Sequence, residues 1–544
     1  MYHCSPSQSV FVVVHGMVHH ARATADNCSR YNCPSYSWCK LSMTTGKPTL
    51  SAYMRWIWRL YLRPGTTKAV VFVCMFLVAG IMFLQNQEKY QDASSLVLVP
   101  VDVEKPRALD VSASGDSKGD SLSGAWVNGA VLSIEEDPIR EPFSDWLTVE
   151  HSKRELFVYA SYLDQRKGLR YVRVIAIIKR KKKVSQCELT TGNQTITVPA
   201  KTKIIRENWN LLYSAAFVLC DVPQDISAPP ESVALVHGGK VDKSSIVPVQ
   251  SLTDRAYHGN MSVCIKPFHY EFNRAVWLVE FVEFYRLLGA SHFIFYNHTV
   301  GPDVKRVLEH YQSEGVATVL PWALPVQSQS EIRTEGIFAA LNDCNYRSIG
   351  RFNFTAHVDV DEFLVPRGYA KLLDLMSGLG NYNTYVFQNV FFYLYWENDT
   401  TVHDAMFGEG PSSNLGISLF GEESLAPYLL TVYKTRRLSR PHKPGTRSKF
   451  IVRPESVVEV GNHNVWEHIS GAKKVLNVPP NKGLSHHYRI CEFGGFDCLK
   501  GKNEIDRTTQ QWMVPLMRRV AEQCRSIFPT LQRCPVAPPL GSPW

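Results

Sequence analysis

Strand-like and helix-like segments alternate between residues 261 and 322 of this 544-residue chain. Three apolar, β-prone segments (261–267, 292–296 and 317–322) are separated by two segments whose apolar residues recur at helical spacing (275–288 and 304–312). This order is typical of a parallel sheet covered by helices, which is an α/β fold. Because ligands of such sheets bind beyond the carboxyl ends of the strands, the order also predicts the edge at which a site would lie.

Three carboxylates follow the next predicted strand. A helix over 332–345 leads to the β-prone run 352–358, after which come Asp359, Asp361 and Glu362 before the chain becomes apolar again. On an extended backbone the side chains of Asp359 and Asp361 point the same way, about 7 Å apart. Carboxylate oxygens favour Mg²⁺ or Mn²⁺, whose sites are completed by substrate phosphates. We therefore predict that Asp359 and Asp361 bind a metal ion that holds a diphosphate; a solvated Asp-x-Asp turn is the alternative.

An uncharged apolar run, 69–84, follows a segment with eight Lys or Arg residues and one acid, Asp26. A basic flank on the N-terminal side predicts that residues 1–68 are cytosolic, that 69–84 is a transmembrane signal-anchor and that the rest is lumenal. So short a span suits the thin membranes of the early secretory pathway. The chain is therefore predicted to be a single-pass type II membrane protein, with a cleaved signal peptide as the alternative.

Composition divides the lumenal part further. Residues 85–144 are rich in Ser, Gly, Asp, Lys and Pro, as expected of a flexible stem. Alternating runs over 145–255 predict a small antiparallel β-rich domain, which precedes the α/β domain at 256–505 and a C-terminal helix and tail at 506–544. The net charge of +9 is modest and lies largely in the N-terminal segment, so no nucleic-acid partner is expected.

The lumenal part carries eight cysteines, an even number in a compartment that favours disulfides. Near neighbours are expected to pair, which gives three candidate disulfides: Cys187–Cys220, Cys491–Cys498 and Cys524–Cys534. Four Asn-x-Ser/Thr triplets are candidate glycosylation sites: Asn193, Asn260, Asn297 and Asn398. A fifth triplet, at Asn353, begins the strand that leads to the carboxylates and is discounted.

Distinctive motifs are spread over residues 255–500. They are Cys-Ile-Lys-Pro at 264–267, Leu-Gly-Ala at 288–290, the strand 292–297, Val-Leu-Pro-Trp at 319–322, Leu-Asn-Asp-Cys at 341–344, Asp-Val-Asp-Glu at 359–362, Lys-Phe-Ile-Val-Arg-Pro at 449–454 and His-Tyr-Arg at 487–489. Together these motifs resemble glycosyltransferase family 92. The resemblance implies a GT-A fold, with a Rossmann-like mixed sheet flanked by helices, and an inverting, metal-dependent enzyme of the Golgi membrane. It also implies transfer of galactose from UDP-galactose to glycan acceptors of glycoproteins through a β-1,4 linkage.

The same resemblance implies a third metal ligand. Enzymes of the GT-A type usually add a histidine from the C-terminal side, for which His487 is the first choice and His463 the second. Lys449 and Arg489, together with Asp359, are candidates for holding the donor diphosphate, as fixed cations do in phosphate sites. The alternatives are that the histidine is only packed in the protein interior and that Lys449 and Arg489 are surface charges.

Glu397 is the candidate catalytic base, because it follows the aromatic run 391–396 and aromatic faces commonly line sugar sites. A solvated glutamate is the alternative. Three other functions stay open: a transferase that uses another UDP-sugar, a non-catalytic lumenal glycan-binding protein with structural Ca²⁺, and a metal-dependent phosphohydrolase. A second copy of the chain also stays open as a partner.

Overall fold

The structure is a computed structural model, and it describes eight segments of the chain: 9–14, 17–22, 145–226, 228–253, 255–408, 414–420, 426–492 and 495–537. The chain forms two compact units, Met1–Val127 and Asn128–Trp544. In the first unit, β1 (Ser9–Val14) pairs with β2 (Met17–Arg22) in an antiparallel hairpin.

The predicted membrane span at 69–84 and the predicted stem at 85–144 lie outside the described residues. Among the residues that are described, no helix is both long enough and apolar enough to cross a membrane. The assignment of cytosolic, membrane and stem segments therefore stays a prediction.

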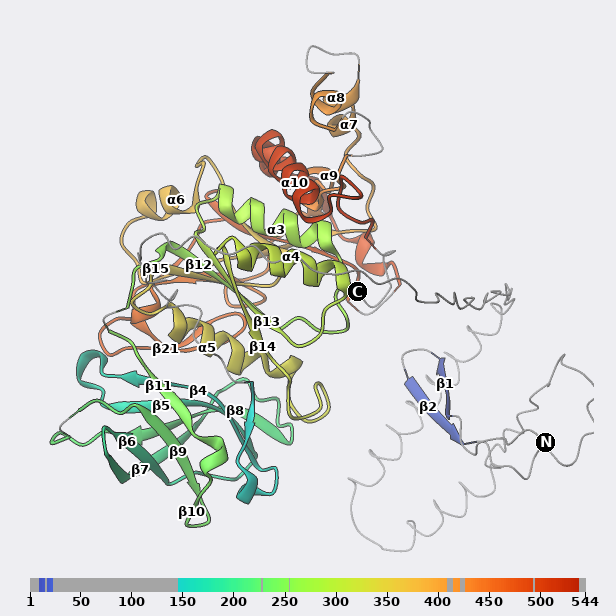
Figure 1. The fold of residues 1–544 in the computed structure, drawn as a ribbon. Coiled ribbons are helices and arrows are strands. Elements are labelled where there is room, and N and C mark those ends of the chain that lie inside the picture. The colour runs from blue at the N-terminus through green and yellow to red at the C-terminus, as the bar shows by residue number, and fades with distance from the viewer. Residues whose placement is uncertain are drawn as a thin grey trace, which may run out of the picture. The chain divides into compact units, whose positions relative to one another are not determined.

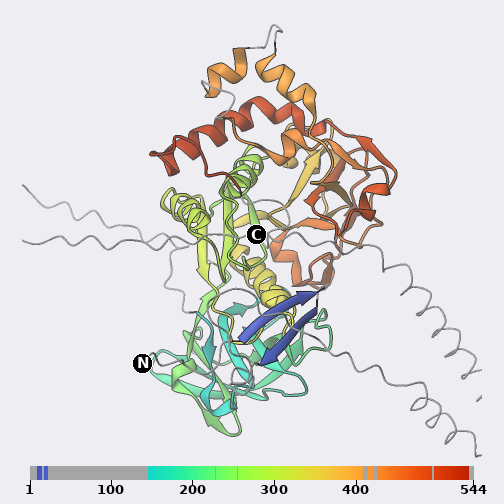
Figure 2. The ribbon, with the colours of Figure 1, turned by 90° about the vertical axis from the view of Figure 1, so that its right-hand side faces the viewer.

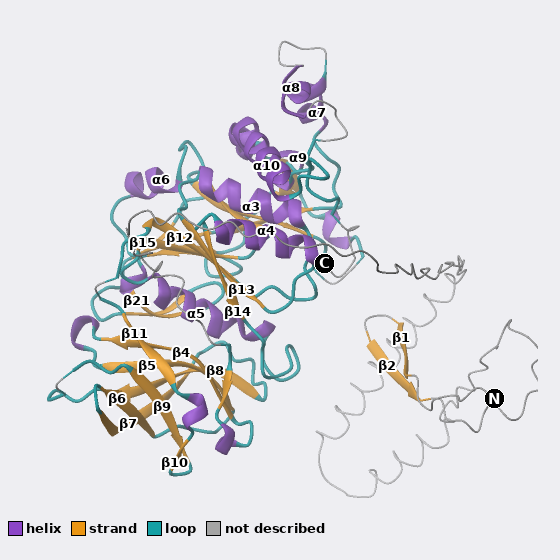
Figure 3. Cartoon of the chain, viewed as in Figure 1, coloured by secondary structure: helices purple, strands orange, loops and turns teal. Residues whose placement is uncertain are grey.

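The second unit begins with a closed β-barrel between residues 147 and 251 (Figure 3). Seven strands form the ring in the order β9-β11-β4-β5-β8-β7-β6, and β6 pairs back with β9. The strands of the ring are β4 (Leu156–Asp164), β5 (Tyr171–Lys179), β6 (Gln186–Thr191), β7 (Gln194–Ile204), β8 (Tyr213–Asp221), β9 (Ser232–His237) and β11 (Val247–Ser251). Two short strands, β3 (Leu147–Thr148) and β10 (Lys240–Val241), pair with the ring from outside.

One pairing in the barrel differs from the antiparallel domain that the sequence predicts, because β11 and β4 run parallel. A closed ring with an odd number of strands cannot alternate direction throughout, so one parallel pair is required. Apolar side chains such as Val174, Val218 and Leu235 fill the barrel. The Cys187–Cys220 disulfide joins β6 to β8 within this apolar interior.

A seven-stranded mixed sheet forms the centre of the rest of the unit, in the order β14-β13-β12-β15-β20-β17-β23. Its strands β12, β13, β14 and β15 are labelled in Figure 1. Its strands are β12 (Gly259–Ile265), β13 (His292–Asn297), β14 (Ala317–Pro321), β15 (Phe352–Val358), β17 (Thr384–Phe387), β20 (Lys449–Val452) and β23 (Val475–Asn477). Strands β12 to β15 run parallel, which confirms the predicted α/β class, and β20 runs antiparallel to β15. Because β13 and β14 lie on one side of β12 and β15 lies on the other, the strand order reverses between β12 and β15. Ligands of open α/β sheets bind at such a switch point.

Helices cover both faces of this sheet. α3 (Ala275–Leu287) and α4 (Pro302–Ser313) lie on one face, whereas α5 (Ile337–Ser348) lies on the other, between the sheet and the barrel (Figure 1). The predicted start of α5 at residue 332 is wrong. Glu335 has a left-handed backbone with a φ of 49°, and the Trp322 indole donates to its carbonyl at 2.7 Å, so the chain turns before the helix begins.

Smaller sheets and further helices complete the described part of the unit. The sheets are formed by β16 (Glu362–Pro366), β24 (Gly483–Arg489) and β18 (Asn389–Tyr393); by β19 (Arg436–Leu438) and β25 (Asn503–Ile505); and by β21 (Val457–Val460) and β22 (Val465–His468). The helices are α6 (Leu372–Leu379), α7 (Thr400–Phe407), α8 (Asn414–Phe420), α9 (Leu430–Tyr433) and α10 (Met513–Ile527). α10 lies beside α3 (Figure 2), and its buried apolar side chains, which include Leu516 and Val520, belong to the same core as those of α3.

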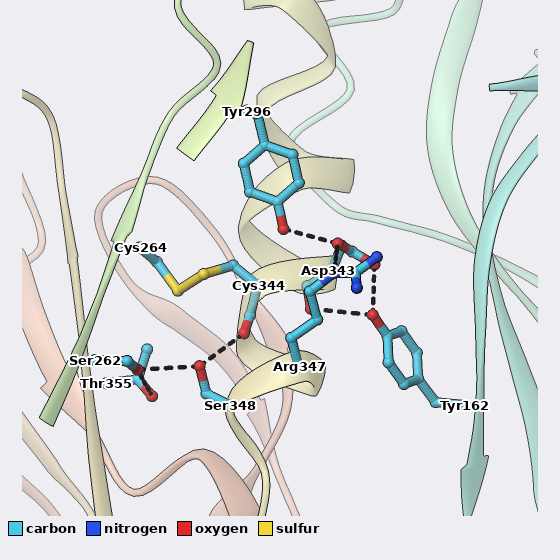
Figure 4. The surroundings of a disulfide bond; sticks show 9 residues. All are labelled: Tyr162, Ser262, Cys264, Tyr296, Asp343, Cys344, Arg347, Ser348 and Thr355. Atoms are coloured by element: carbon cyan, nitrogen blue, oxygen red, sulfur yellow. Dashed lines mark hydrogen bonds and ion pairs between the residues drawn. A yellow bond between two sulfur atoms is a disulfide. The ribbon is translucent and has the colours of Figure 1, made fainter. Parts of the chain in front are cut away.

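All eight cysteines of the second unit form disulfides. The three predicted pairs, Cys187–Cys220, Cys491–Cys498 and Cys524–Cys534, are confirmed. The fourth disulfide, Cys264–Cys344, joins β12 to α5 (Figure 4).

A buried polar group on α5 connects the barrel with the sheet (Figure 4). Asp343 accepts hydrogen bonds from the hydroxyl of Tyr162 in the barrel, at 2.6 Å, and from the hydroxyl of Tyr296 in β13, at 2.7 Å. The guanidinium of Arg347 lies 2.6 Å from the same carboxylate. Apolar residues of the barrel and the sheet meet around Trp322, so the two share one core.

Candidate active site

The three carboxylates lie at the switch point of the sheet: Asp359 and Asp361 in the turn between β15 and β16, and Glu362 at the start of β16. The amide of Glu362 donates to the carbonyl of Asp359 at 3.0 Å, which closes the turn. The prediction of an extended backbone through Asp359 and Asp361 is therefore wrong. The turn points the two side chains at different counter-charges, so Asp359 faces two lysines and Asp361 faces a histidine.

Asp359 lies between two ammonium groups. Its Oδ2 is 3.3 Å from Nζ of Lys266, and its Oδ1 is 3.2 Å from Nζ of Lys449. Lys266 directly follows β12, in which Ile265 pairs with Val358, so the register of the sheet brings Lys266 beside Asp359. Burial raises the pKa of Asp359, but Lys266 and Lys449 lower it by more, and the pKa lies well below its usual range. Asp359 is therefore an anion that fixes both lysines.

Glu362 is the buried member of the three carboxylates. Its side chain is 1% exposed, and its Oε2 lies 3.1 Å from Nζ of Lys449, which is itself 2% exposed. Lys449 begins β20, and its Nζ also lies 2.8 Å from Oδ1 of Asn462. Burial raises the pKa of Glu362, and Lys449 opposes this rise. The ammonium group of Lys449 is thus surrounded by protein acceptors, and it holds the turn in place.

Asp361 and His487 face each other on the more open side of the turn. Oδ2 of Asp361 lies 3.3 Å from Nε2 of His487, and the two side chains are 27% and 11% exposed. The other ring nitrogen of His487, Nδ1, lies 3.2 Å from Oε1 of Glu362 and 3.2 Å from Nδ2 of Asn389. Oδ1 of Asp361 is buried without a hydrogen-bond partner in the described part of the chain. A carboxylate behind an imidazole is the arrangement that directs a histidine ligand toward a metal ion.

These distances suit a metal ion with few protein ligands. Adjacent ligands of an octahedral ion at about 2.1 Å lie about 3 Å apart, which is close to the 3.3 Å between Asp361 and His487. Asp359 and Glu362 are engaged by lysines, and no three His, Cys, Asp or Glu side chains among the described residues converge as a complete metal site. The residues therefore fit an ion held by two side chains, with its other positions left for water or substrate.

Residues 259–522, which include the sheet and all of these side chains, match the sequence model of glycosyltransferase family 92. This domain belongs to glycosyltransferase family 92. None of the curated proteins matches the chain significantly.

Two solved structures show weak likenesses to this chain. One, described as the crystal structure of a mycobacterial protein, has a TM-score of 0.21 and 14% identity, covering 52% of this chain and 77% of that chain. The other, glucosyl-3-phosphoglycerate synthase from Mycobacterium tuberculosis in complex with phosphoglyceric acid, has a TM-score of 0.19 and 13% identity, covering 48% of this chain and 80% of that chain. TM-scores this low support no argument about this chain.

Within the family 92 domain, Lys266 is the site residue that the sequence analysis missed. Lys449, predicted to face the diphosphate, is buried against Glu362, whereas the side chain of Lys266 is 23% exposed. The available signal was its position near the C-terminal end of the predicted parallel strand 261–267, as Asp359 directly follows the predicted strand 352–358. Lys266 is therefore the better placed of the two lysines to meet a phosphate group.

The ring of Phe391 lies between Arg489 and the candidate metal ligand His487. The guanidinium carbon of Arg489 is 5.0 Å from the centre of the Phe391 ring, and Phe391 contacts His487 with ring centres 5.3 Å apart. Strands β18 and β24 produce this arrangement, because Phe391 pairs with His487 in their parallel register. The role of Arg489 toward the donor stays a prediction.

His463, the second choice as metal ligand, lies in the turn between β21 and β22. Its Nδ1 is 3.2 Å from the carbonyl of Ser448, and its Nε2 is 3.2 Å from Nδ2 of Asn462. Burial, helped by Lys449, lowers the pKa of His463 to about 4, so the ring is neutral. Of the two histidines, His487 is the one that the structure places beside Asp361.

Glu397, the predicted base, is exposed in the loop before α7. No hydrogen bond or ion pair joins its side chain to the carboxylates and lysines of the described site. Its neighbour Trp396 contacts Tyr393 with ring centres 5.2 Å apart, so an aromatic surface does adjoin the loop. The role of Glu397 stays a prediction.

The candidate glycosylation sites differ in exposure. Asn193 lies in the exposed turn between β6 and β7, and Asn260 and Asn398 are also exposed, whereas Asn297 is half-buried at the end of β13. Asn353, discounted from the sequence, is exposed and donates to Oδ1 of Asn260 at 3.0 Å. Glycan occupancy stays a prediction at each of these positions.

Proposed function

We propose that the chain transfers a sugar from a nucleoside diphosphate donor to a glycan acceptor, and that Asp361 and His487 hold a divalent metal ion for this reaction. The proposal rests on two successive contacts at the switch point of a family 92 domain: Glu362 contacts one ring nitrogen of His487, and Asp361 contacts the other. Imidazole and carboxylate together suit Mn²⁺, and carboxylate with water suits Mg²⁺.

The charges around the turn support a diphosphate as the ligand. Three carboxylates (Asp359, Asp361 and Glu362) stand against two ammonium groups (Lys266 and Lys449), which leaves one excess negative charge. A divalent cation would reverse this sign. The centre would then attract an anion such as the diphosphate of a nucleotide sugar.

The side chains of this chain have distinct tasks in such a transfer. Lys266 is placed to contact a phosphate oxygen, and Asp359 fixes its ammonium group before the substrate arrives, so little reorganisation is needed when charge develops on the leaving group. Lys449 and Glu362 hold the turn and the imidazole of His487. A bound metal ion supplies further positive charge to the leaving diphosphate. Glu397 is retained as the candidate base for the acceptor hydroxyl.

The finer assignments are part of the same proposal. The donor is UDP-galactose, the acceptor is a glycan of a glycoprotein, and the product has a β-1,4 linkage with inverted configuration; the family resemblance supports these points. A GT-A fold is supported by the mixed sheet with acids at its switch point. A Golgi location and type II topology are supported by the apolar run 69–84 and its basic flank.

The test is a transfer assay with the purified full-length chain. UDP-galactose, UDP-glucose and UDP-N-acetylglucosamine are offered with a panel of glycans, with Mn²⁺, Mg²⁺ or EDTA, and UDP release and product linkage are measured. We expect transfer from UDP-galactose that EDTA abolishes. Asp361→Asn is expected to lower kcat/KM by at least about a hundredfold, because it weakens electrostatic stabilisation of the leaving group.

A matched variant separates this effect from a general one. Asp374→Asn changes an exposed aspartate on α6 and should leave the rate unchanged. Full activity of Asp361→Asn, or equal rates with EDTA and Mn²⁺, would refute the assigned metal site. Glycan binding without any UDP release would support the glycan-binding alternative.

A further inference from the structure

The turn at residues 461–464, between β21 and β22, reaches the buried lysine of the active site. Oδ1 of Asn462 lies 2.8 Å from Nζ of Lys449, closer than Oε2 of Glu362 at 3.1 Å or Oδ1 of Asp359 at 3.2 Å. An ammonium group placed among three acceptors is directed by all of them. The position of Asn462 is therefore one of the three contacts that set where Lys449 lies between the two carboxylates.

Glu207 of the barrel contacts this turn. It lies beyond the end of β7, and its Oε1 accepts a hydrogen bond from the indole Nε1 of Trp466, in β22, at 2.6 Å. Both groups rest on the backbone of Gly461: a β-carbon at that position would lie 2.2 Å from Oε1 of Glu207 and 2.1 Å from Nε1 of Trp466. No residue with a side chain fits there unless one of them moves. Glu207 thus fixes the backbone directly before Asn462.

Other barrel residues hold the same hairpin. Nζ of Lys203 lies 3.0 Å from Oε2 of Glu459 in β21 and 2.6 Å from Oε2 of Glu467 in β22. The amide of Arg206 donates to Oε1 of Glu459 at 3.1 Å. Glu459 is fully buried, so its contacts belong to an interior interface, whereas Glu467 lies at the exposed edge of that interface. The hairpin is therefore anchored to the barrel along both of its strands.

We propose that Glu207 is a positioning residue of the active site, which acts from the barrel through Gly461 and Trp466 to hold Asn462 against Lys449. The inference rests on the proposed transferase function. It assigns the barrel a role in catalysis: the barrel sets the geometry of the lysine that fixes Asp359 and Glu362. Loss of Glu207 should therefore impair use of the donor while leaving the KM for the acceptor unchanged.

A double-mutant cycle with the full-length chain tests this route. Glu207→Ala should lower kcat/KM for the donor about tenfold or more, as loss of residues that orient a site commonly does. Glu207→Gln should retain most of the rate, because its amide oxygen still accepts from Trp466. Adding Glu207→Ala to Asn462→Ala should cause no further loss, because both changes break the same connection.

Glu231→Ala provides the matched control. Glu231 is an exposed barrel carboxylate whose Oε1 accepts from the amide of Gly192 at 3.2 Å, as Glu207 accepts from Trp466, and its removal should leave the rate unchanged. If the fold losses in kcat/KM caused by Glu207→Ala and by Asn462→Ala multiply in the double variant, the proposal is overturned. A normal rate in Glu207→Ala, or equal losses in the Ala and Gln variants, would also overturn it.

A second measurement does not depend on activity. Amide hydrogen exchange over residues 461–464 should become faster in Glu207→Ala and stay unchanged in Glu231→Ala. Unchanged exchange in Glu207→Ala would overturn the positioning role even if the unmodified chain transferred no sugar. An inactive unmodified chain with faster exchange in Glu207→Ala would refute the proposed function and leave the structural role of Glu207 supported.

Discussion

Replacing Cys264 and Cys344 together by alanine should destabilise the second unit more than removing any other of its disulfides. Cys264 lies in β12, two residues before Lys266, and Cys344 lies in α5 (Figure 4). Both cysteines are fully buried. The disulfide therefore ties strand β12 of the sheet to α5, the helix that packs against the barrel.

The expected loss follows from the length of chain that each disulfide closes. The Cys264–Cys344 pair spans 80 residues, whereas the Cys491–Cys498 pair spans 7. Loop-closure entropy gives a loss of about 4.5 kcal/mol for the longer loop and about 2.4 kcal/mol for the shorter one at 25 °C. With an unfolding entropy of about 2.1 cal/mol/K per residue over the 379 described residues of the second unit, these losses correspond to Tm decreases of about 6 °C and about 3 °C.

Thermal unfolding followed by circular dichroism measures both shifts under one set of conditions. The Cys491→Ala/Cys498→Ala variant is the matched control, because it also removes two cysteines and one disulfide. Reduction of the unmodified chain before heating should lower the Tm at least as far as the Cys264→Ala/Cys344→Ala change does. A control variant that loses as much stability as the Cys264→Ala/Cys344→Ala variant would refute the argument from loop length.

Two further predictions concern buried carboxylates. Burial raises the pKa of Glu280 to about 7, although its carboxylate accepts hydrogen bonds from the amides of Leu430 and Thr431. The folded state therefore binds this proton more tightly than the unfolded state does. The resulting contribution to the free energy of unfolding, about 3 kcal/mol, is fully present at pH 4 and is lost as the pH rises through 7. Urea unfolding between pH 4 and 8 should show this decrease, and Glu280→Gln should abolish it; an unchanged slope in that variant would contradict the assignment. Lys449→Met should cost about 3–5 kcal/mol, because it leaves Glu362 buried without a counter-charge. Thermal unfolding should show that adding Glu362→Gln restores most of this loss, and no restoration would contradict the pairing.

Much of the fold could be predicted because its elements obey local rules. The alternation between residues 261 and 322 predicted β12, α3, β13, α4 and β14 in their order, since the two periods of apolar residues differ between strand and helix. The start of α5 could not be predicted in the same way. It depends on the left-handed backbone of Glu335, which a distant indole from Trp322 stabilises.

The site could be predicted in part. Asp359 and Asp361 were found because acids between two apolar runs are unusual, and His487 was found only through the family resemblance. Lys266 was missed because it meets Asp359 through the pairing of β12 with β15, which is a relation between residues far apart in the sequence. Two lysines, Lys266 after β12 and Lys449 at the start of β20, lie against Asp359, and Asp361 is left to face the histidine.

The topology of the chain changes at the boundary between the barrel and the family 92 domain, but one apolar cluster extends across this boundary. The face of the barrel that carries Tyr159 and Tyr162 is buried by α5 and Trp322. A domain boundary usually falls where few contacts cross it, in exposed and polar chain. Here an apolar, buried cluster crosses the boundary, and polar contacts cross it as well: one at Asp343 leads toward the sheet, and one at Glu207 leads toward the active-site turn. The barrel and the family 92 domain are therefore packed as one unit, which is the arrangement that the proposed positioning of the buried lysine from the barrel requires.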